Sequence, residues 1–201
     1  MSHPRKAVLF LPLLLTALTG AAWAEPRVLV LDPAASKVSF LLDATGHDVE
    51  GTMAVKSGRV TFDPATGQAS GEISIDLKSA RTGNDSRDKT MHDDVLQTGS
   101  YPTAVFRAEK VRGALAPSGP SRIQLDGTLS FHGGEHKVTL PAQVEVRDGR
   151  LTGDARFEVP YVAWGLKDPS IMILRVGKKV DVTVHAVGSL EGAAVAAAGV
   201  R

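Results

Sequence analysis

Residues 137–146 read KVTLPAQVEV, and apolar side chains occupy every second position from Val138 to Val146. A period of two over this length is typical of a β-strand that turns one face to a core and the other to water. From Leu29 onward, continuous apolar runs, which mark buried parallel strands, are missing. The stretch therefore predicts an antiparallel strand with one dry and one wet face.

The same alternation returns on both sides of this segment, in residues 72–78, 124–131 and 180–186. Tight-turn signals separate the apolar-polar runs and would join neighbours as hairpins: Asp63–Gly67, Gly133-Gly134 and Asp148-Gly149. About eight or nine strands fit into the chain at this spacing. The fold class that we predict is all-β.

Residues 85–96 (DSRDKTMHDDVL) break the alternation. Met91, Val95 and Leu96 have helical spacing, and Asn84 or Asp85 can serve as an N-cap. We expect one helix here, lying across an end of the sheet.

The N-terminus has the pattern of a secretory signal peptide. A basic start is followed by an apolar run from Ala7 to Leu18, and Ala22-Trp23-Ala24 offers a cleavage site after Ala24. The run is too short for a membrane span. We therefore expect a cleaved signal at 1–24 and a periplasmic or secreted protein without an integral membrane span. For the rest of the chain, we expect one barrel domain at 25–188 and a disordered tail at 189–201.

Charge and cysteine content exclude several classes of protein. Removal of Arg5 and Lys6 with the signal leaves 21 of the 23 basic residues against 22 acidic ones. A nearly neutral chain without basic clusters has no field that would attract nucleic acid. The absence of cysteine excludes disulfides, thiol nucleophiles and thiolate metal sites.

Closure into a barrel would remove the exposed edges of so many antiparallel strands. A barrel of about eight strands has an interior that is either filled by side chains or able to hold one small ligand. Aromatic residues make up only 5% of the chain, so the inward side chains are mostly small and aliphatic. From the alternation alone, a cavity and a solid core both remain open.

No constellation for catalysis or metal binding is evident. His132 and His136 have the spacing of a zinc pair, but a helix is needed for that arrangement and Gly133-Gly134 prevents one. A polar hairpin turn is the better interpretation. The chain has no nucleophile elbow and no phosphate-binding glycine loop. We expect no enzyme activity, no cofactor and no metal site.

The chain resembles the YceI-like family of exported lipid-binding proteins over roughly residues 31–188. The motifs that carry the resemblance are Val38-Ser39-Phe40, Gly46-His47 with Val49-Glu50-Gly51, Phe62-Asp63-Pro64, Thr82-Gly83-Asn84 with Arg87-Asp88, Tyr101-Pro102 with Phe106, Leu125–Leu129 with His132-Gly133 and Leu140-Pro141, and Trp164-Gly165 with Asp168-Pro169-Ser170. Many relatives carry His-Leu after the Arg-Asp pair, whereas this chain has Met91-His92.

The resemblance implies a lipocalin-like antiparallel barrel that encloses a polyisoprenoid or fatty-acid-like ligand, without catalytic residues. The candidate apolar wall, chosen by alternation, is Phe40, Leu42, Met53, Val55, Phe62, Ile73, Ile75, Leu77, Phe106, Leu129 and Phe131. The candidates for the barrel mouth are His47, Arg87, Met91, His92 and Trp164. An alternative for Arg87 is an ion pair with Asp88 that fixes the helix.

Two functions of different kinds follow. The first is a soluble protein that carries, stores or sequesters a long-chain lipid or isoprenoid. The second is a stress-linked or interaction scaffold with a filled barrel and no ligand. The sequence leaves a homodimer open.

Overall fold

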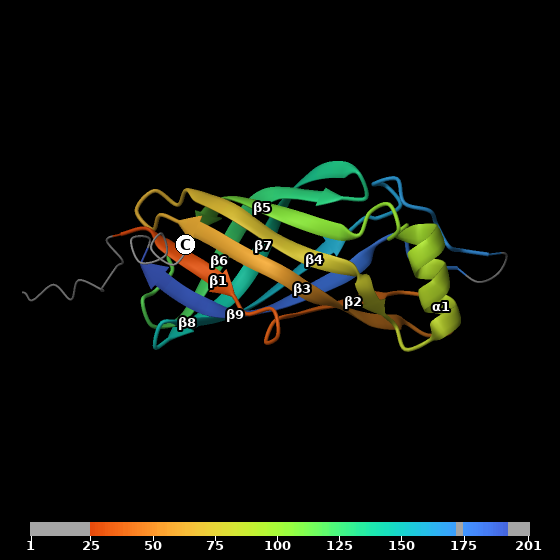
Figure 1. Ribbon diagram of the computed structural model, residues 1–201, viewed down its shortest axis with the longest axis horizontal. Helices are drawn as coiled ribbons and strands as arrows, with labels where there is room; N and C mark the ends of the chain where they lie inside the picture. Colours follow the sequence, from red (N-terminus) through yellow and green to blue (C-terminus); the bar gives the residue numbers. More distant parts are fainter. Residues whose placement is uncertain (1–24, 172–174, 193–201) are drawn as a thin grey trace, which may run out of the picture.

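The computed structural model describes residues 25–171 and 175–192, which form one antiparallel sheet closed into a barrel (Figure 1). The elements are β1 (Arg27–Leu31), β2 (Lys37–Leu42), β3 (Val49–Phe62), β4 (Ala69–Arg81), α1 (Asp85–Thr90), the π-helical turn η1 (Met91–Val95), β5 (Thr103–Arg112), β6 (Gly119–Phe131), β7 (Gly134–Arg147), β8 (Arg150–Val159) and β9 (Val180–Gly192). The predicted all-β barrel with one short helix is confirmed. Within the described ranges, no helix has the length and apolar character needed to cross a bilayer.

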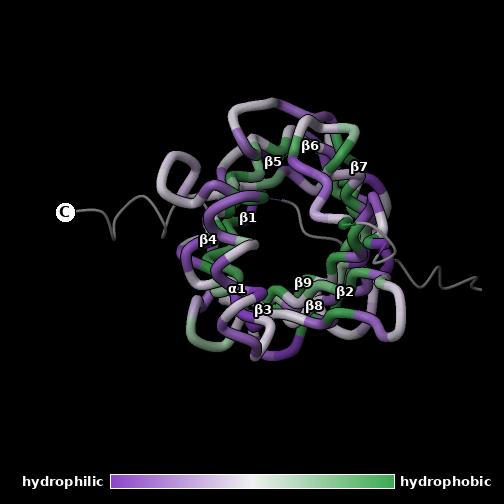
Figure 2. The backbone as a smooth tube through the Cα atoms, turned by 90° about the vertical axis from the view of Figure 1, so that its right-hand side faces the viewer, coloured by the Kyte–Doolittle hydropathy of each residue, from purple (hydrophilic) through white to green (hydrophobic). Residues whose placement is uncertain are grey.

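Nine strands occupy eight places in the ring. β1 and β2 run in the same direction, and both pair with β3 on one side and β9 on the other. They are two halves of one long strand that leaves the sheet at Asp32–Ser36. The ring then runs β3, β4, β5, β6, β7, β8 and β9. Figure 2 shows it end-on, from the side on which α1 lies.

The break between β1 and β2 has a local cause. Pro33 has no N–H to give to a ladder, so it does not suit the middle of a strand. The Asp32 carboxylate accepts from the backbone N–H groups of Ala34 and Ala35 (3.0 and 3.2 Å) and closes a turn. Ser36 then returns the chain to the sheet, because its hydroxyl exchanges hydrogen bonds with the backbone of Val187 (3.0 and 3.1 Å).

The two ends of the barrel differ. β2, β4, β6 and β8 finish at the end that carries α1, which we call the helix end. The turns Asp63–Gln68 and Asp148-Gly149 lie at the opposite end, which we call the far end. α1 lies across the helix end, as predicted (Figure 1).

The predicted helix 85–96 has two parts. α1 begins at the N-cap Asn84, whose side chain accepts from the Arg87 N–H (3.0 Å). After Thr90 the turn widens, and the Leu96 N–H donates to the Met91 carbonyl (2.8 Å), five residues back. The apolar spacing predicted where this helical segment begins and ends. It did not predict the change to a π-helical turn at Met91–Val95.

The tail boundary expected after Gly188 is wrong. β9 continues to Gly192, and Ser189–Gly192 pair with Val30–Arg27 of β1. Leu190 explains the extension, because its side chain is buried in the core at the far end. The remaining residues of the expected tail, 193–201, and the expected signal peptide, 1–24, lie outside the described residues.

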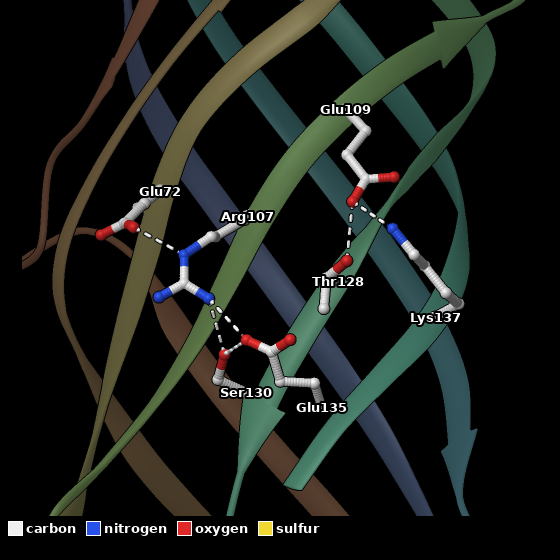
Figure 3. A network of polar contacts seen from close by, with 7 residues as sticks. All are labelled: Glu72, Arg107, Glu109, Thr128, Ser130, Glu135 and Lys137. Carbon is white, nitrogen blue, oxygen red and sulfur yellow. Dashed lines mark hydrogen bonds and ion pairs between the residues drawn. The ribbon is translucent and has the colours of Figure 1, made fainter.

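The outer face of the barrel is wet and charged. Arg107 on β5 donates to Glu72 on β4 (3.0 Å), and also to Ser130 on β6 and Glu135 on β7 (2.9 and 3.1 Å) (Figure 3). A smaller network around Glu109 joins the same β5 to β6 and β7. Solvent screens such exposed pairs, so they favour the strand register more than they add stability.

Candidate ligand cavity

A cavity of about 810 Å³ lies inside the barrel. Inward side chains of β1 to β9 line it, and they are almost all aliphatic or aromatic. Polar side chains enter the wall mainly at the helix end, where Thr82, Asn84, Ser86, Arg87 and Thr90 surround the mouth. The alternation left open whether the interior is filled, and the structure answers with a cavity.

The structure places eleven of the sixteen predicted site residues in the cavity wall: Phe40, Leu42, Met53, Ile73, Ile75, Leu77, Arg87, Met91, Phe106, Leu129 and Phe131. All but Arg87 and Met91 come from strands. The period of two found them, because every second residue of a barrel strand points inward.

Five predicted residues lie outside the cavity wall. Val55 is buried in a core cluster with Leu31 and Val38, which themselves reach the cavity. Phe62 packs at the far end of the barrel, with Val146 and Leu190.

The other three are His47, His92 and Trp164. His47 is exposed in the loop between β2 and β3, and its Nδ1 lies 2.9 Å from the Asp48 carbonyl. His92 turns toward the end of β4, where its Nε2 lies 3.0 Å from the Ala80 carbonyl. Trp164 stacks on the imidazole of His136, with ring centroids 3.8 Å apart and an interplanar angle of 8°.

The expected turn at Gly133-Gly134 is present, with His132 and Gly133 at positive φ (49° and 78°). One detail differs from the sequence interpretation of an incidental polar turn. His136 continues the inward column of Val138 and Leu140 on β7, and its ring packs under Trp164. The hairpin thus contributes an aromatic stack at the helix end.

Sequence reasoning missed part of the wall. Four inward residues of β7 belong to it: Val138, Leu140, Ala142 and Val144. Ala155 and Phe157 of β8, and Val180, Val182, Val184 and Ala186 of β9, line the same side. The same alternation marks all of them, so this signal was available. Tyr161, Leu166 and Ile171 come from the irregular segment after β8, for which the sequence has no comparable signal.

Tyr161 shows how a polar group is tolerated in this wall. Its hydroxyl donates to the Gly177 carbonyl (2.7 Å), which satisfies the hydrogen bond inside the protein. Burial, reinforced by the charge of Asp168, raises the pKa of Tyr161 to about 12. The phenol therefore stays neutral and presents its ring to the cavity.

Thr82 organises the polar side of the mouth. Its backbone N–H and its hydroxyl both donate to Oδ1 of Asp88 (2.8 and 2.6 Å). Arg87 donates from Nε to the Thr82 hydroxyl (2.8 Å) and from Nη2 to the Thr82 carbonyl (3.0 Å). The alternative of an Arg87–Asp88 ion pair is therefore corrected, because both side chains bind Thr82 instead.

Asp88 is buried away from the cavity, whereas the neighbouring Arg87 lines it. Burial acts to raise the pKa of Asp88, but the hydrogen bonds from Thr82 and the charges of Arg81 and His92 lower it on balance. Asp88 is buried and does not reach the cavity. Arg87 does line the cavity and brings a positive charge to its mouth.

Two inward glycines make room for aromatic rings. Gly51 on β3 pairs with Phe40 on β2, and a Cβ at Gly51 would overlap the Phe40 ring. A Cβ at Gly127 on β6 would lie 2.5 Å from Cζ of Phe106 on β5. Each ring lies over a position without a side chain, so the cavity keeps more of its width.

Comparisons with known proteins agree with this architecture. The model of the YceI-like domain matches residues 29–188. BcnA from Burkholderia cenocepacia has a TM-score of 0.64 and 25% identity, covering 78% of this chain and 98% of that chain. A comparison with curated proteins gave no match.

Two further solved structures share the fold. A polyisoprenoid binding domain from Saccharophagus degradans, implicated in plant cell wall breakdown, has a TM-score of 0.63 and 20% identity, covering 81% and 98% of the two chains. A YCEI protein from Campylobacter jejuni has a TM-score of 0.57 and 17% identity, covering 71% and 85%.

Proposed function

This chain belongs to the YceI-like domain family, and we propose that it is an exported binding protein that holds a long apolar ligand inside its barrel. The ligand class that we propose is polyisoprenoid or fatty-acid-like, and the role is transport, storage or sequestration. The observation that carries the proposal is the apolar cavity of about 810 Å³ enclosed by the strands.

The energetics of this cavity favour a ligand of that class. Each methylene group moved from water into an apolar wall contributes ~0.8 kcal/mol. A wall with few polar groups gives water little to bind, whereas an apolar chain fills it and contacts it throughout. The polar groups gather at one mouth, which suits a ligand with a long apolar body and one polar end.

The test is to purify residues 25–201 without detergent, extract the protein with organic solvent and analyse the extract by mass spectrometry. We expect an isoprenoid or fatty-acyl species in stoichiometric amount. An empty extract, followed by failure of the protein to take up added long-chain lipids, would overturn the proposal. That result would favour the scaffold function, in which the barrel serves as a surface for other proteins.

Export is proposed from the sequence of residues 1–24, which has the pattern of a cleaved signal. The corresponding measurement is the N-terminal sequence of the protein recovered from a periplasmic or secreted fraction. We expect it to begin at Glu25. A chain that retains Met1 in the cytoplasmic fraction would contradict this proposal.

We also propose that the protein acts by binding alone. At the mouth, Thr82, Asn84 and Arg87 are engaged in structural hydrogen bonds, either in the junction between Thr82 and Asp88 or in the cap of α1. Assays with model esters across a range of pH should give rates equal to those of buffer. A pH-dependent rate that tracks the protein concentration would refute this.

A further inference from the structure

A compact apolar cluster packs inside the barrel at the far end. Its members are Phe62, Val144, Val146, Leu151 and Leu190, with exposed fractions from 1% to 9%. They come from β3, β7, β8 and β9, near the turns that close this end. Phe62 is the one aromatic residue among these five.

The cluster reaches from one side of the bore to the other. In the ring of eight strand places, β3 and β7 lie four places apart, which is diametrically opposite. Phe62 on β3 and Val144 on β7 nevertheless belong to one packed cluster. The cluster therefore has members on opposite walls of the barrel interior at this end.

The cavity ends at this cluster. Val144 and Leu151 belong both to the cluster and to the cavity wall, whereas Phe62, Val146 and Leu190 belong to the cluster alone. The last three thus lie behind the surface that the cavity presents. At the other end the cavity reaches α1, where Arg87 and Met91 line it. The enclosed space has one polar mouth and one apolar floor.

We propose that Phe62 fixes the position of this floor, and that it thereby sets the longest apolar chain that the barrel holds in full. This inference rests on the proposed function. On β7 the wall runs from Val138 to Val144, about 20 Å along the strand at ~3.4 Å per residue. With strands tilted by ~40°, this corresponds to about 15 Å along the barrel axis.

A floor of this kind produces a defined length preference. A chain that grows toward Phe62 gains affinity with each unit, because each added group is removed from water. A chain that has reached the floor gains nothing from further units, since they must stay in the solvent at the mouth or fold back. Removal of the Phe62 ring moves the point at which the gain stops.

The experiment is a displacement titration with geraniol, farnesol, geranylgeraniol and solanesol against a bound fluorescent fatty acid. In the unmodified protein we expect the affinity to rise along the series and then level off. Phe62→Leu and Phe62→Ala should move the plateau to a longer chain. We expect the affinity ratio between the two isoprenols that flank the original plateau to rise at least tenfold, about 1.4 kcal/mol.

A second variant tests the opposite direction. Ala142 lines the cavity and packs directly against the floor cluster. Ala142→Leu places a larger side chain in space that is open, so it should raise the floor and move the plateau to a shorter chain. Ala142→Leu removes no buried contact. The proposal can therefore still be tested with this variant if Phe62→Ala does not fold.

Val55→Ala is the control, since Val55 is buried but belongs neither to the cavity wall nor to the floor cluster. It should lower stability and leave the plateau in place. Unchanged plateaus in both Phe62→Leu and Ala142→Leu would overturn the role of Phe62 while the proposed function stands. Failure of the unmodified protein to bind any isoprenol or the fatty acid would overturn the proposed function, and this inference with it.

Discussion

Asp88 and Arg87 are adjacent in sequence, and each holds a different part of Thr82. The Asp88 carboxylate accepts hydrogen bonds from the Thr82 N–H and hydroxyl, whereas Arg87 donates to the Thr82 hydroxyl oxygen and carbonyl. Thr82 is the residue at which β4 leaves the sheet, three positions before α1 begins. The pair therefore fixes the direction of the chain as it enters α1, and this places Arg87 and Met91 at the cavity mouth.

Asp88→Ala should loosen this junction. The substitution leaves the half-buried Thr82 N–H and hydroxyl without this acceptor, and we expect a loss in the free energy of unfolding toward the lower end of about 1–3 kcal/mol. Chemical denaturation followed by circular dichroism measures the change. Asp85→Ala is a suitable control because Asp85 is exposed in the same helix. Equal stability of the two variants would contradict the role given to Asp88.

The same carboxylate gives a pH dependence. The pKa of Asp88 is lower in the folded protein than its ordinary value, so the folded state favours the ionised form. This contribution to stability is present above the unfolded pKa of about 4 and is lost as the pH falls through the lower, folded value. The stability lost by the unmodified protein on acidification should therefore exceed that lost by Asp88→Asn. Identical pH profiles of stability for the two proteins would contradict a stabilising contribution from ionised Asp88.

Arg87→Ala tests the mouth. The guanidinium lines the cavity and is held by neutral groups of Thr82, so its positive charge is offered to the polar end of a ligand. We expect weaker retention of bound lipid during washing, with the barrel still folded and the melting temperature lowered only by the loss of the two hydrogen bonds to Thr82. Mass spectrometry of the washed protein measures retention, and Arg87→Lys is the charge-preserving control. Lipid content equal to that of the unmodified protein would remove Arg87 from the site.

At the scale of the strand pair, Gly51 and Phe40 show how the cavity keeps its width. Gly51→Ala introduces a methyl group into the position of the Phe40 ring. We expect a loss of about 1–3 kcal/mol in stability, as is usual for overpacking, and a reduced ligand load because the ring is driven into the lumen.

Two comparisons make this prediction specific. Phe40→Leu in the Gly51→Ala background should recover part of the stability, and a double-mutant cycle gives the coupling between the two positions. Gly99→Ala is the matched control, because nothing lies within 4 Å of a Cβ at Gly99. A coupling energy near zero would show that the ring and the glycine are independent.

The elements also show what the sequence could reveal. Alternation identified the strands and most of the wall predicted on them, since a period of two is a property of the backbone alone. Alternation placed Phe62 in the wall because Phe62 is on the inward face of β3. Alternation does not show how far along the barrel axis a residue lies, so it cannot distinguish the cavity wall from the floor. The contribution of Tyr161 and Leu166 depends on an irregular segment, where no period exists. The Ala/Gly-rich composition after Gly188 predicts a disordered tail and gives no sign that Leu190 is buried.

At the scale of the whole molecule, residues 25–171 and 175–192 lead us to expect that a ligand enters the cavity at the helix end. The far end is filled by the floor cluster, while the wall at the helix end is made of side chains from α1, η1 and the segment after β8. Loops and short helical turns open at lower free energy than strands that are paired on both sides. A ligand should therefore enter and leave beside α1 and not between the strands.

Cysteine chemistry can test this direction, because the natural chain contains no cysteine and a single introduced thiol reports alone. Met91→Cys puts the thiol in the cavity wall at the mouth, and Val146→Cys puts it behind the floor, where the exposed fraction is 1%. Each variant is treated with a thiol-specific labelling reagent. Such a reagent reacts with the thiolate, so both variants are compared at one alkaline pH. Cys at position 91 should react readily without ligand, and ~100-fold more slowly when ligand is present at ~100 times its Kd, since only the unbound fraction reacts. Cys at position 146 should stay unreactive in both conditions until the protein is unfolded. An unchanged labelling rate at position 91 with ligand bound would contradict entry beside α1, whereas rapid labelling at position 146 in the folded protein would show that the far end opens.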